Sequence, residues 1–144
     1  MPHSPDDLLS RLDALGFETA TVEHPPLFTV AQSRDLRGKI EGGHTKNLFL
    51  KDKKDRLWLV VAPEDAEIDM KRLHARLGSA RLSFGKPELL VETLGVVPGS
   101  VTPFGAINDT QGRVTGCGVQ VSPTQARPPV TFSLLVTGGA TWAR

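Results

Sequence analysis

Two apolar runs separated by a short polar stretch constrain the fold of this sequence more than any other feature. Residues 47–51 and 57–62 are rich in Leu, Val, Phe and Trp, and the stretch between them reads Asp52-Lys53-Lys54-Asp55-Arg56. Runs of this kind joined by a few polar residues are typical of a β-hairpin. Both runs are nearly continuous in apolar residues, which favours strands that are buried on both faces. We therefore predict a hairpin at the centre of a sheet.

Helix signals surround this hairpin. Ser4 can cap a helix that begins at Pro5, and Gly16 can end it. Apolar residues at near-helical spacing predict further helices over residues 65–77 and 87–94, each followed by glycine, and a short helix over 30–36. Shorter strands are expected over residues 19–22, 81–84, 101–107 and 130–136. Strand pairs mixed with helices favour an α+β fold with a mixed sheet over a doubly wound fold.

Length and composition point to a single soluble domain. A chain of 144 residues can bury a real core, and we expect one domain spanning residues 1–144. Cys117 is its only cysteine, so an internal disulfide is impossible and a reducing compartment is favoured. No apolar run approaches the roughly 20 residues that span a bilayer. We expect a cytoplasmic protein that does not bind a membrane.

The sequence gives little support for a metal site or for a catalytic cysteine or serine nucleophile. The histidines lack the spacing of metal ligands, and one cysteine cannot complete a thiolate site. Cys117 has no histidine near it, and neither Ser83 nor Ser100 lies in a Gly-x-Ser-x-Gly setting. We therefore expect no metal and no cofactor. The four histidines are His3, His24, His44 and His74.

A glycine-flanked polar cluster leads into the first run of the hairpin. Gly42 and Gly43 precede His44-Thr45-Lys46-Asn47, which offers an imidazole, a hydroxyl, an ammonium and an amide in consecutive positions. Glycines allow a backbone to approach a ligand closely. Lys46 can bind a phosphate as a point charge or polarise a carbonyl. The alternative interpretation is an ordinary surface lysine at the edge of a strand.

A second glycine-containing segment follows the helix predicted over residues 87–94. Gly99 and Pro103 frame a stiff loop that can present backbone N–H groups to a ligand. The alternative is a plain connection between a helix and a strand. Residues 34–56 carry eight basic and four acidic side chains, which favours either contact with a polyanion or a solvated, lysine-rich hairpin. A pI near 8.0 is too low to indicate nucleic-acid binding unaided.

Several of these segments together resemble the YbaK/prolyl-tRNA-synthetase-associated editing family. The similarity runs in order through residues 5–115 and is strongest to the freestanding branch that removes alanine from mischarged proline tRNA. The segments that carry it are His24-Pro25-Pro26, Phe28-Thr29-Val30, Gly42 to Asp52, Leu57-Trp58-Leu59-Val60, Arg81-Leu82-Ser83-Phe84-Gly85, Leu94-Gly95-Val96, Pro98 to Gly105 and Asn108-Asp109.

The resemblance implies a mixed, barrel-like sheet flanked by helices and a metal-independent hydrolysis of the ester between an amino acid and the terminal adenosine. Lys46 falls on the family's key lysine and is the expected catalytic residue. The substrate's own ribose hydroxyl is thought to help activate water in this family. Gly99 and Pro103 fall on a Gly-x-x-x-Pro loop that is expected to hold the aminoacyl group. The expected substrate-binding residues are His44, Thr45, Asn47, Phe28, Leu50, Gly99, Ser100 and Pro103.

The same resemblance implies partners and a limit. Aminoacylated tRNA, in particular tRNA-Pro, is the expected ligand, prolyl-tRNA synthetase is a candidate partner, and we expect a monomer. From about Thr115 onward the sequence departs from the family, with Ser133 where the family carries histidine, and the last 35 residues contain no acid and no lysine. We expect residues 116–144 to form an atypical, truncated end. The alternative function is therefore a non-catalytic tRNA-binding module or a degenerate paralogue of the editing domain.

Overall fold

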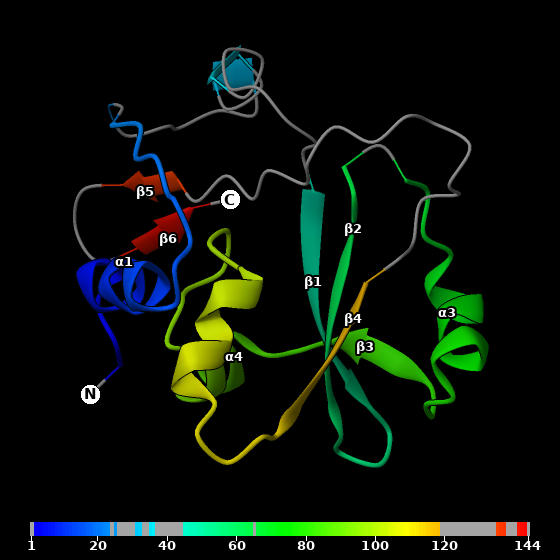
Figure 1. The fold of residues 1–144 in the computed structure, drawn as a ribbon. Coiled ribbons are helices and arrows are strands. Elements are labelled where there is room, and N and C mark those ends of the chain that lie inside the picture. Colours follow the sequence, from blue (N-terminus) through cyan, green and yellow to red (C-terminus); the bar gives the residue numbers. More distant parts are fainter. Residues whose placement is uncertain are drawn as a thin grey trace.

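The predicted hairpin is present at the centre of the protein. The structure is a computed structural model that describes residues 2–23, 25, 31–32, 35–36, 45–64, 66–118, 135–137 and 141–143 (Figure 1). Strand β1 (Thr45–Asp52) pairs antiparallel with β2 (Leu57–Pro63), with Phe49 opposite Leu59. The turn between them places Asp55 at a φ of 62°. The hairpin prediction is confirmed.

Two further strands extend this hairpin into a mixed, four-stranded sheet. Strand β3 (Leu82–Phe84) pairs antiparallel with β1, and β4 (Val114–Gly118) pairs parallel with β2. The strand order is therefore β3-β1-β2-β4, with the hairpin in the middle. A separate antiparallel pair consists of β5 (Leu135–Thr137) and β6 (Thr141–Ala143). The α+β class and the mixed sheet with flanking helices agree with the prediction.

The helices begin and end at the residues that cap them. In α1 (Pro5–Ala14) the Ser4 hydroxyl accepts from the Asp7 N–H, and the Asp7 carboxylate accepts from the Ser4 N–H. This backbone hydrogen bond from Ser4 holds the pKa of Asp7 below its ordinary value. Helix α4 (Pro87–Leu94) ends at Gly95, which has a φ of 66°. Among the described helices, none is long and apolar enough to cross a membrane.

Helix α3 (Met70–Leu77) is shorter than the predicted helix over residues 65–77. Asp69 has an extended backbone, and its side chain accepts from the N–H of Lys71 at 2.9 Å. An Asp in this role caps a helix and fixes its first turn. Upstream of it, the Ala66 N–H donates to the Pro63 carbonyl in a turn. The helix therefore begins at Met70.

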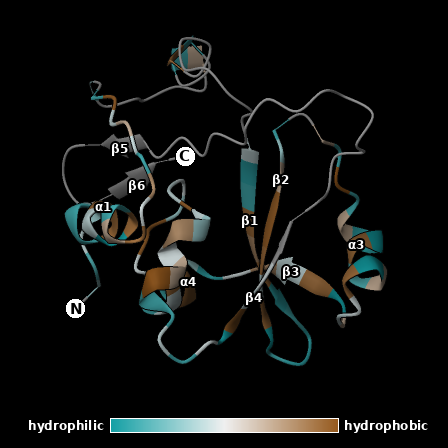
Figure 2. Cartoon of the chain, in the orientation of Figure 1, coloured by the Kyte–Doolittle hydropathy of each residue, from teal (hydrophilic) through white to brown (hydrophobic). Residues whose placement is uncertain are grey.

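The sheet lies between two layers of helices. Successive residues of β1 point to opposite faces. Phe49 packs with Leu90 and Leu94 of α4 and with Leu8 of α1, whereas Leu50 packs against Leu73 of α3. Figure 2 shows β2 as hydrophobic along most of its length, whereas β1 is hydrophilic at its start. Leu50 and Leu94 are fully buried, and burial of such a side chain contributes about 1.5–3 kcal/mol.

The prediction of a strand over residues 101–107 is wrong. A 3-10 helix, η1 (Pro103–Asn108), takes its place. The proline ring fixes a φ compatible with a helical turn, and the Thr102 hydroxyl accepts from the Phe104 N–H. The strand predicted over 19–22 is also absent. Of the helix predicted over 30–36, residues 31–32 and 35–36 are helical and the others lie outside the described residues, as do residues 130–134 of the last predicted strand.

Candidate functional site

A side-chain hydrogen bond joins the start of β1 to the loop between α4 and η1. Asn47 is 6% exposed. Its Nδ2 donates to the backbone carbonyl of Val101 at a distance of 2.9 Å. The two residues lie in the two segments that the sequence singled out as candidate sites, the polar cluster and the Gly99–Pro103 loop. The structure therefore brings these segments into contact.

A tight turn gives this loop its shape. The Ser100 N–H donates to the Val97 carbonyl at 3.0 Å, with Pro98 and Gly99 between them. Proline at the second position and a glycine with a φ of 88° at the third are the pattern of a type II turn. Ser100, the last residue of this turn, is buried. The loop is thus held in one conformation by its own backbone.

Hydrogen bonds also fix the flanks of the loop. On its C-terminal side the Gly105 N–H donates to the Thr102 carbonyl at 3.1 Å, and Thr102 is buried. On its N-terminal side the Asn108 Nδ2 donates to the carbonyl of Leu94 at 2.9 Å. The Asn108 Oδ1 accepts from the backbone N–H of His3 at 2.7 Å. Asn108 thereby ties together the end of α4, the end of η1 and the chain segment before α1.

The other amide atom of Asn47 is a buried acceptor. Because Nδ2 faces the Val101 carbonyl, the orientation of the amide is fixed by that contact. Its Oδ1 is buried and receives no hydrogen bond from the part of the chain that the structure describes. A buried acceptor left without a donor costs about 1–3 kcal/mol. A ligand that brings an N–H group to this atom would remove that cost.

Lys46 lies on the opposite face of β1 from Asn47. Its Nζ donates to the carbonyl of Ala66, in the connection between β2 and α3. By the alternation of a strand it shares its face with Leu48 and Leu50, which pack toward α3. An ammonium group has three N–H donors, and among the described residues the Ala66 carbonyl is the acceptor of one of them, which leaves two for a ligand. A ligand that contacts both Lys46 and Asn47 therefore has to extend from one face of the sheet to the other around the start of β1.

The remaining predicted residues are spread over different parts of the protein. Thr45 begins β1 and pairs opposite Pro63. Leu50 has no exposed surface and belongs to the core on the α3 face, away from the Val101 contact. Pro103 is the first residue of η1. His44 and Phe28 lie outside the described residues.

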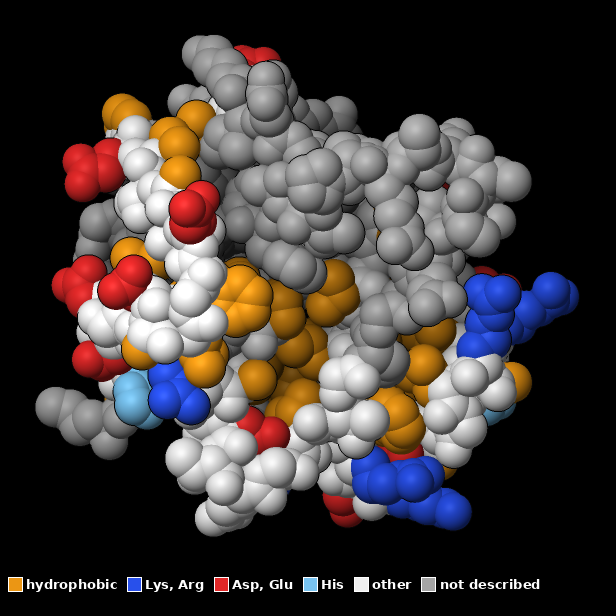
Figure 3. All heavy atoms as spheres, viewed as in Figure 1, with side chains coloured by type: hydrophobic (Ala, Val, Ile, Leu, Met, Phe, Trp, Pro, Cys, Tyr) orange, Lys and Arg blue, Asp and Glu red, His pale blue; other side chains and the backbone are white. Residues whose placement is uncertain are grey.

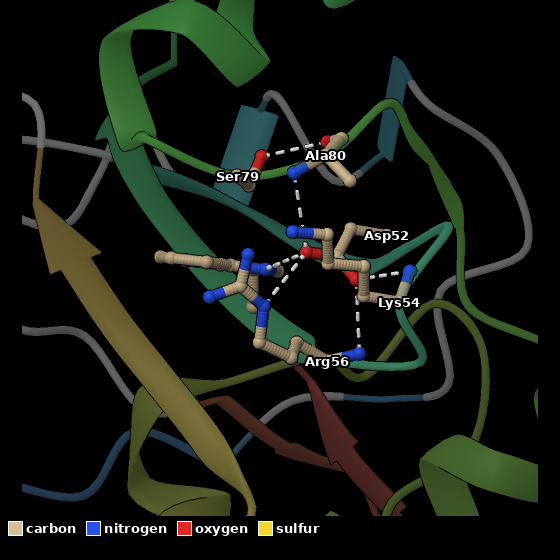
Figure 4. A network of polar contacts seen from close by, with 6 residues as sticks. Asp52, Lys54, Arg56, Ser79 and Ala80 are labelled. Atoms are coloured by element: carbon tan, nitrogen blue, oxygen red, sulfur yellow. Dashed lines mark hydrogen bonds and ion pairs between the residues drawn. The ribbon is translucent and has the colours of Figure 1, made fainter.

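Asp52, in the segment predicted as a polar turn, is a buried carboxylate. Its side chain has no exposed surface. It accepts from the backbone N–H groups of Lys54, Arg56 and Ala80, from the Arg56 guanidinium and from the Trp58 indole (Figure 4). An Asp directly before a turn typically accepts hydrogen bonds from the backbone N–H groups that follow it. This position is the signal in the sequence that could have identified Asp52.

The same hydrogen bonds set the charge of this carboxylate. Burial by itself raises the pKa of Asp52, because it disfavours the charged form. The N–H groups of Arg56, Lys54 and Ala80 and the indole of Trp58 act in the other direction and outweigh it. The net result is a pKa below the ordinary value, so Asp52 is ionised at neutral pH. Its negative charge joins the hairpin to the connection between α3 and β3.

Potential metal ligands are scattered over the described part of the chain. In those residues there is no group of three or more His, Cys, Asp or Glu side chains that could hold an ion. The polar groups of the candidate site are instead an amide, hydroxyls, an ammonium and backbone N–H groups. Such groups bind substrate and stabilise developing negative charge.

Residues 24–115 match the aminoacyl-tRNA editing domain family. The chain belongs to this family. The matched range contains the described part of the polar cluster, the whole hairpin, α3, α4, the Gly99–Pro103 loop and η1. Both segments joined by Asn47 and Val101 therefore lie within the editing domain.

Two proteins with similar sequences have names that refer to prolyl-tRNA synthetase or to prolyl-tRNA editing. The chain is 40% identical over 116 residues to prolyl-tRNA synthetase associated domain-containing protein 1 of Danio rerio, covering 78% of this chain and 63% of that protein. It is 36% identical over 108 residues to the prolyl-tRNA editing protein ProX of Acetoanaerobium sticklandii, covering 74% of this chain and 66% of that protein. The chain thus spans somewhat less than two thirds of the length of these relatives.

The fold also matches a solved structure. The crystal structure of hypothetical protein APE2540 superposes with a TM-score of 0.60, covering 77% of this chain and 71% of that one. The sequences are 20% identical, so this likeness supports the fold alone.

Proposed function

We propose that this editing-domain protein acts in trans and hydrolyses the ester bond of mischarged aminoacyl-tRNA, with alanyl-tRNA(Pro) as its best substrate. The observation that carries the proposal is the hydrogen bond between Asn47 and Val101, which joins the two candidate segments inside the range matched by the family. The named relatives, a prolyl-tRNA editing protein and a prolyl-tRNA synthetase associated protein, support tRNA-Pro as the tRNA. Prolyl-tRNA synthetase is a candidate partner in the cytoplasm.

In this proposal the Gly99–Pro103 loop holds the aminoacyl group. The loop is fixed by its own turn and by contacts on both flanks, as a site needs if it is to discriminate by shape. The free Oδ1 of Asn47 accepts a hydrogen bond from the α-ammonium of the amino acid. This contact gives the buried acceptor the donor that it lacks in the described residues.

Lys46 supplies positive charge on the other side of β1. Its two remaining N–H donors can bind the phosphate next to the terminal adenosine or offset negative charge that builds up on the ester. Loss of one such donor in other enzymes raises the barrier by about 2.7–4 kcal/mol. The terminal nucleotide would therefore lie across the start of β1, with its ester between the Lys46 side and the loop side. This arrangement uses no metal and no protein nucleophile.

Selection of alanine over the cognate proline has to come from pocket size and from contacts with the tRNA. Excluding one methylene from an apolar pocket discriminates by only about 1–3 kcal/mol. In this proposal Phe28 lines the pocket. Leu50 lies in the core on the α3 face and contributes only by holding β1 in place. Contacts with tRNA-Pro supply the remainder of the selectivity.

A second candidate is a non-catalytic tRNA-binding module. The observation that favours it is that the family match ends at residue 115, so that residues 116–144 lie beyond the matched range. Such a protein would bind proline tRNA without releasing an amino acid.

Release of amino acid from three charged tRNAs distinguishes these candidates. The purified protein is incubated with alanyl-tRNA(Pro), prolyl-tRNA(Pro) and alanyl-tRNA(Ala), each labelled in the amino acid. We expect the fastest hydrolysis with alanyl-tRNA(Pro). Equal release from all three contradicts the proposed specificity, and binding without release from any of them supports the second candidate.

A further inference from the structure

Three segments that lie far apart in the sequence meet at the base of the Gly99–Pro103 loop. They are Pro2 and His3 before α1, Leu94 and Gly95 at the end of α4, and Asn108 at the end of η1. Gly95 is the centre of this junction. A Cβ on it would lie 2.6 Å from Nδ2 of Asn108 and 2.8 Å from Cβ of Pro2. The three segments are therefore packed together with no room for a side chain on Gly95.

Asn108 closes the segment that contains the loop. Its Nδ2 donates to the Leu94 carbonyl, which directly precedes residues 95–107, and Asn108 itself directly follows them. The bond joins residues that are 14 positions apart. The two ends of residues 95–107 are thus held together, while the Asn47 Nδ2 holds the middle of the segment at the Val101 carbonyl.

The backbone N–H of His3 sets the orientation of the Asn108 side chain. It donates at 2.7 Å to Oδ1, the other polar atom of the same amide. The two hydrogen bonds together direct Nδ2 to Leu94 and Oδ1 to His3. Loss of the His3 donor removes one of the two contacts that fix this amide, so the bond that closes the loop segment would weaken.

Helix α1 sets the position of His3. Ser4, the next residue, is the N-cap of this helix, and its reciprocal hydrogen bonds with Asp7 fix the backbone there. Leu8 of the same helix belongs to the core that contains Leu94 of α4. Figure 3 shows hydrophobic side chains gathered between α1 and the sheet. The His3 N–H is therefore presented by an anchored helix.

We propose that Pro2 and His3 form a strap that positions the Gly99–Pro103 loop through Asn108, and that this positioning sets the selectivity for the amino acid. The inference rests on the proposed function, in which the loop holds the aminoacyl group. Asn108 and the His3 N–H are positioning groups, because they contact the ends of the loop segment. Discrimination by shape requires a loop that stays in place. Loss of the strap should therefore lower the preference for alanine over the larger proline.

Two substitutions at position 3 separate the backbone contact from the side chain. His3→Pro removes the N–H donor together with the imidazole, whereas His3→Ala removes only the imidazole. His3 is exposed, so both proteins should fold, which circular dichroism and urea unfolding verify. Release from alanyl-tRNA(Pro) and from prolyl-tRNA(Pro) gives kcat/KM for each, and the ratio of the two values measures selectivity. The ratio does not depend on the amount of folded protein, so a loss of folded protein alone leaves it unchanged.

The two variants should differ in this ratio. We expect His3→Pro to lower it by about threefold or more, as for the loss of one hydrogen bond, and His3→Ala to leave it unchanged. Because the loop holds the aminoacyl group in the proposed function, KM for alanyl-tRNA(Pro) should rise more than kcat falls. Equal ratios for His3→Pro and His3→Ala would overturn the proposal.

A double-mutant cycle with Asn108→Ala tests whether the effect passes through Asn108. Proline also fixes the φ of position 3, and the cycle separates that effect from loss of the hydrogen bond. Asn108→Ala removes the acceptor, so adding His3→Pro should change the ratio no further. A full additional decrease in this background would show that position 3 acts without Asn108 and would contradict the strap.

Hydrogen exchange separates failure of this inference from failure of the proposed function. The N–H groups of Ser100 and Gly105 donate within the loop and its flank, so their exchange rates report on the loop without any substrate. Exchange of both should be about threefold faster or more in His3→Pro than in His3→Ala. Release of alanine with equal selectivity in the two variants overturns this inference and leaves the deacylase standing. Faster exchange in His3→Pro, in a protein that releases no amino acid, supports the strap and contradicts the deacylase.

Discussion

The side-chain amide of Asn47 donates a 2.9 Å hydrogen bond to the backbone carbonyl of Val101. Asn47 lies near the start of a central strand, and Val101 lies in a loop that is closed by a type II turn. The contact spans 54 residues of sequence. It holds the loop against the sheet and leaves the Asn47 Oδ1 without a donor among the described residues. Stability and substrate binding should both depend on it.

Replacement of Asn47 by leucine should lower both the stability of the protein and its affinity for substrate. Leucine has a similar volume but leaves the Val101 carbonyl without its donor, and it also removes the buried Oδ1 that lacks a donor among the described residues. Because the second effect offsets part of the first, we expect a net destabilisation of about 1 kcal/mol. In the proposed function the same change removes the acceptor for the substrate ammonium, so KM should rise. Urea unfolding and steady-state deacylation measure the two effects. An Asn47→Leu protein with unchanged stability and KM would contradict both roles.

Gly99→Ala should destabilise the loop through its backbone alone. Gly99 has a φ of 88°, and a Cβ built there meets no atom of the described residues within 4 Å, so the expected effect comes from the backbone conformation. A residue with a Cβ in left-handed conformations is disfavoured by about 1–2 kcal/mol. Gly99→Asn is the matched control, because asparagine tolerates this region better than alanine. Thermal unfolding should rank the wild type first, Gly99→Asn second and Gly99→Ala last; equal midpoints for all three would show that the turn is not strained by a side chain.

Gly85→Ala should disturb the core next to the sheet. A Cβ on Gly85 would lie 2.4 Å from the ring of Phe49, which is 4% exposed and cannot move into solvent. Overpacking of this kind costs about 1–3 kcal/mol. Gly116→Ala in β4 is the control, since no atom of the described residues lies within 4 Å of its Cβ position, and it should change stability by no more than about 0.5 kcal/mol. Urea unfolding of the two variants checks the difference, which should vanish if Phe49 can shift freely.

Asp52→Asn should lower stability at neutral pH and lose its effect in acid. The pKa of Asp52 in the folded protein lies below its unfolded value, because its N–H donors outweigh burial. The ionised carboxylate therefore stabilises the fold above the unfolded pKa of about 3.9, and this contribution disappears as the pH falls through the lower, folded value.

The comparison of urea midpoints between wild type and Asp52→Asn from pH 7 to pH 2 tests this linkage. Asp7 also has a lowered pKa, but both proteins contain it, so its effect cancels in the difference. The gap between the two midpoints should be largest at neutral pH and should narrow below about pH 4. A gap that stays constant across this range would show that the charge of Asp52 does not stabilise the hairpin.

The sequence predicted those elements whose signals are local. The hairpin follows from two apolar runs around a polar turn, and α1 follows from Ser4 and Pro5. The prediction of a strand over residues 101–107 was wrong because it relied on the apolar and β-branched residues of this segment. Thr102 and Pro103 together start a 3-10 helix there. Capping and proline geometry outweighed strand propensity there.

The site was predicted less completely than the fold. The polar cluster and the Gly99–Pro103 loop were identified as candidates, but their contact depends on a bond between residues 54 apart, which no local pattern shows. Side chains of adjacent residues in a strand point to opposite faces of the sheet. The predicted strand therefore implies that Lys46 and Asn47 lie on opposite faces. Asp52 was missed because a carboxylate in a charged turn is usually exposed, and here the backbone N–H groups around it permit its burial.

The most direct test of the deacylase is single-turnover release of labelled alanine from alanyl-tRNA(Pro) by the wild type and by Lys46→Ala. The Lys46 Nζ also donates to the Ala66 carbonyl, so unfolding of the variant is measured alongside and release is recorded well below its transition. We predict rapid release by the wild type and a decrease of about 100-fold or more in the folded variant, as for a lost donor to developing negative charge. Equal rates for the two proteins, or no release by the wild type, would contradict the account.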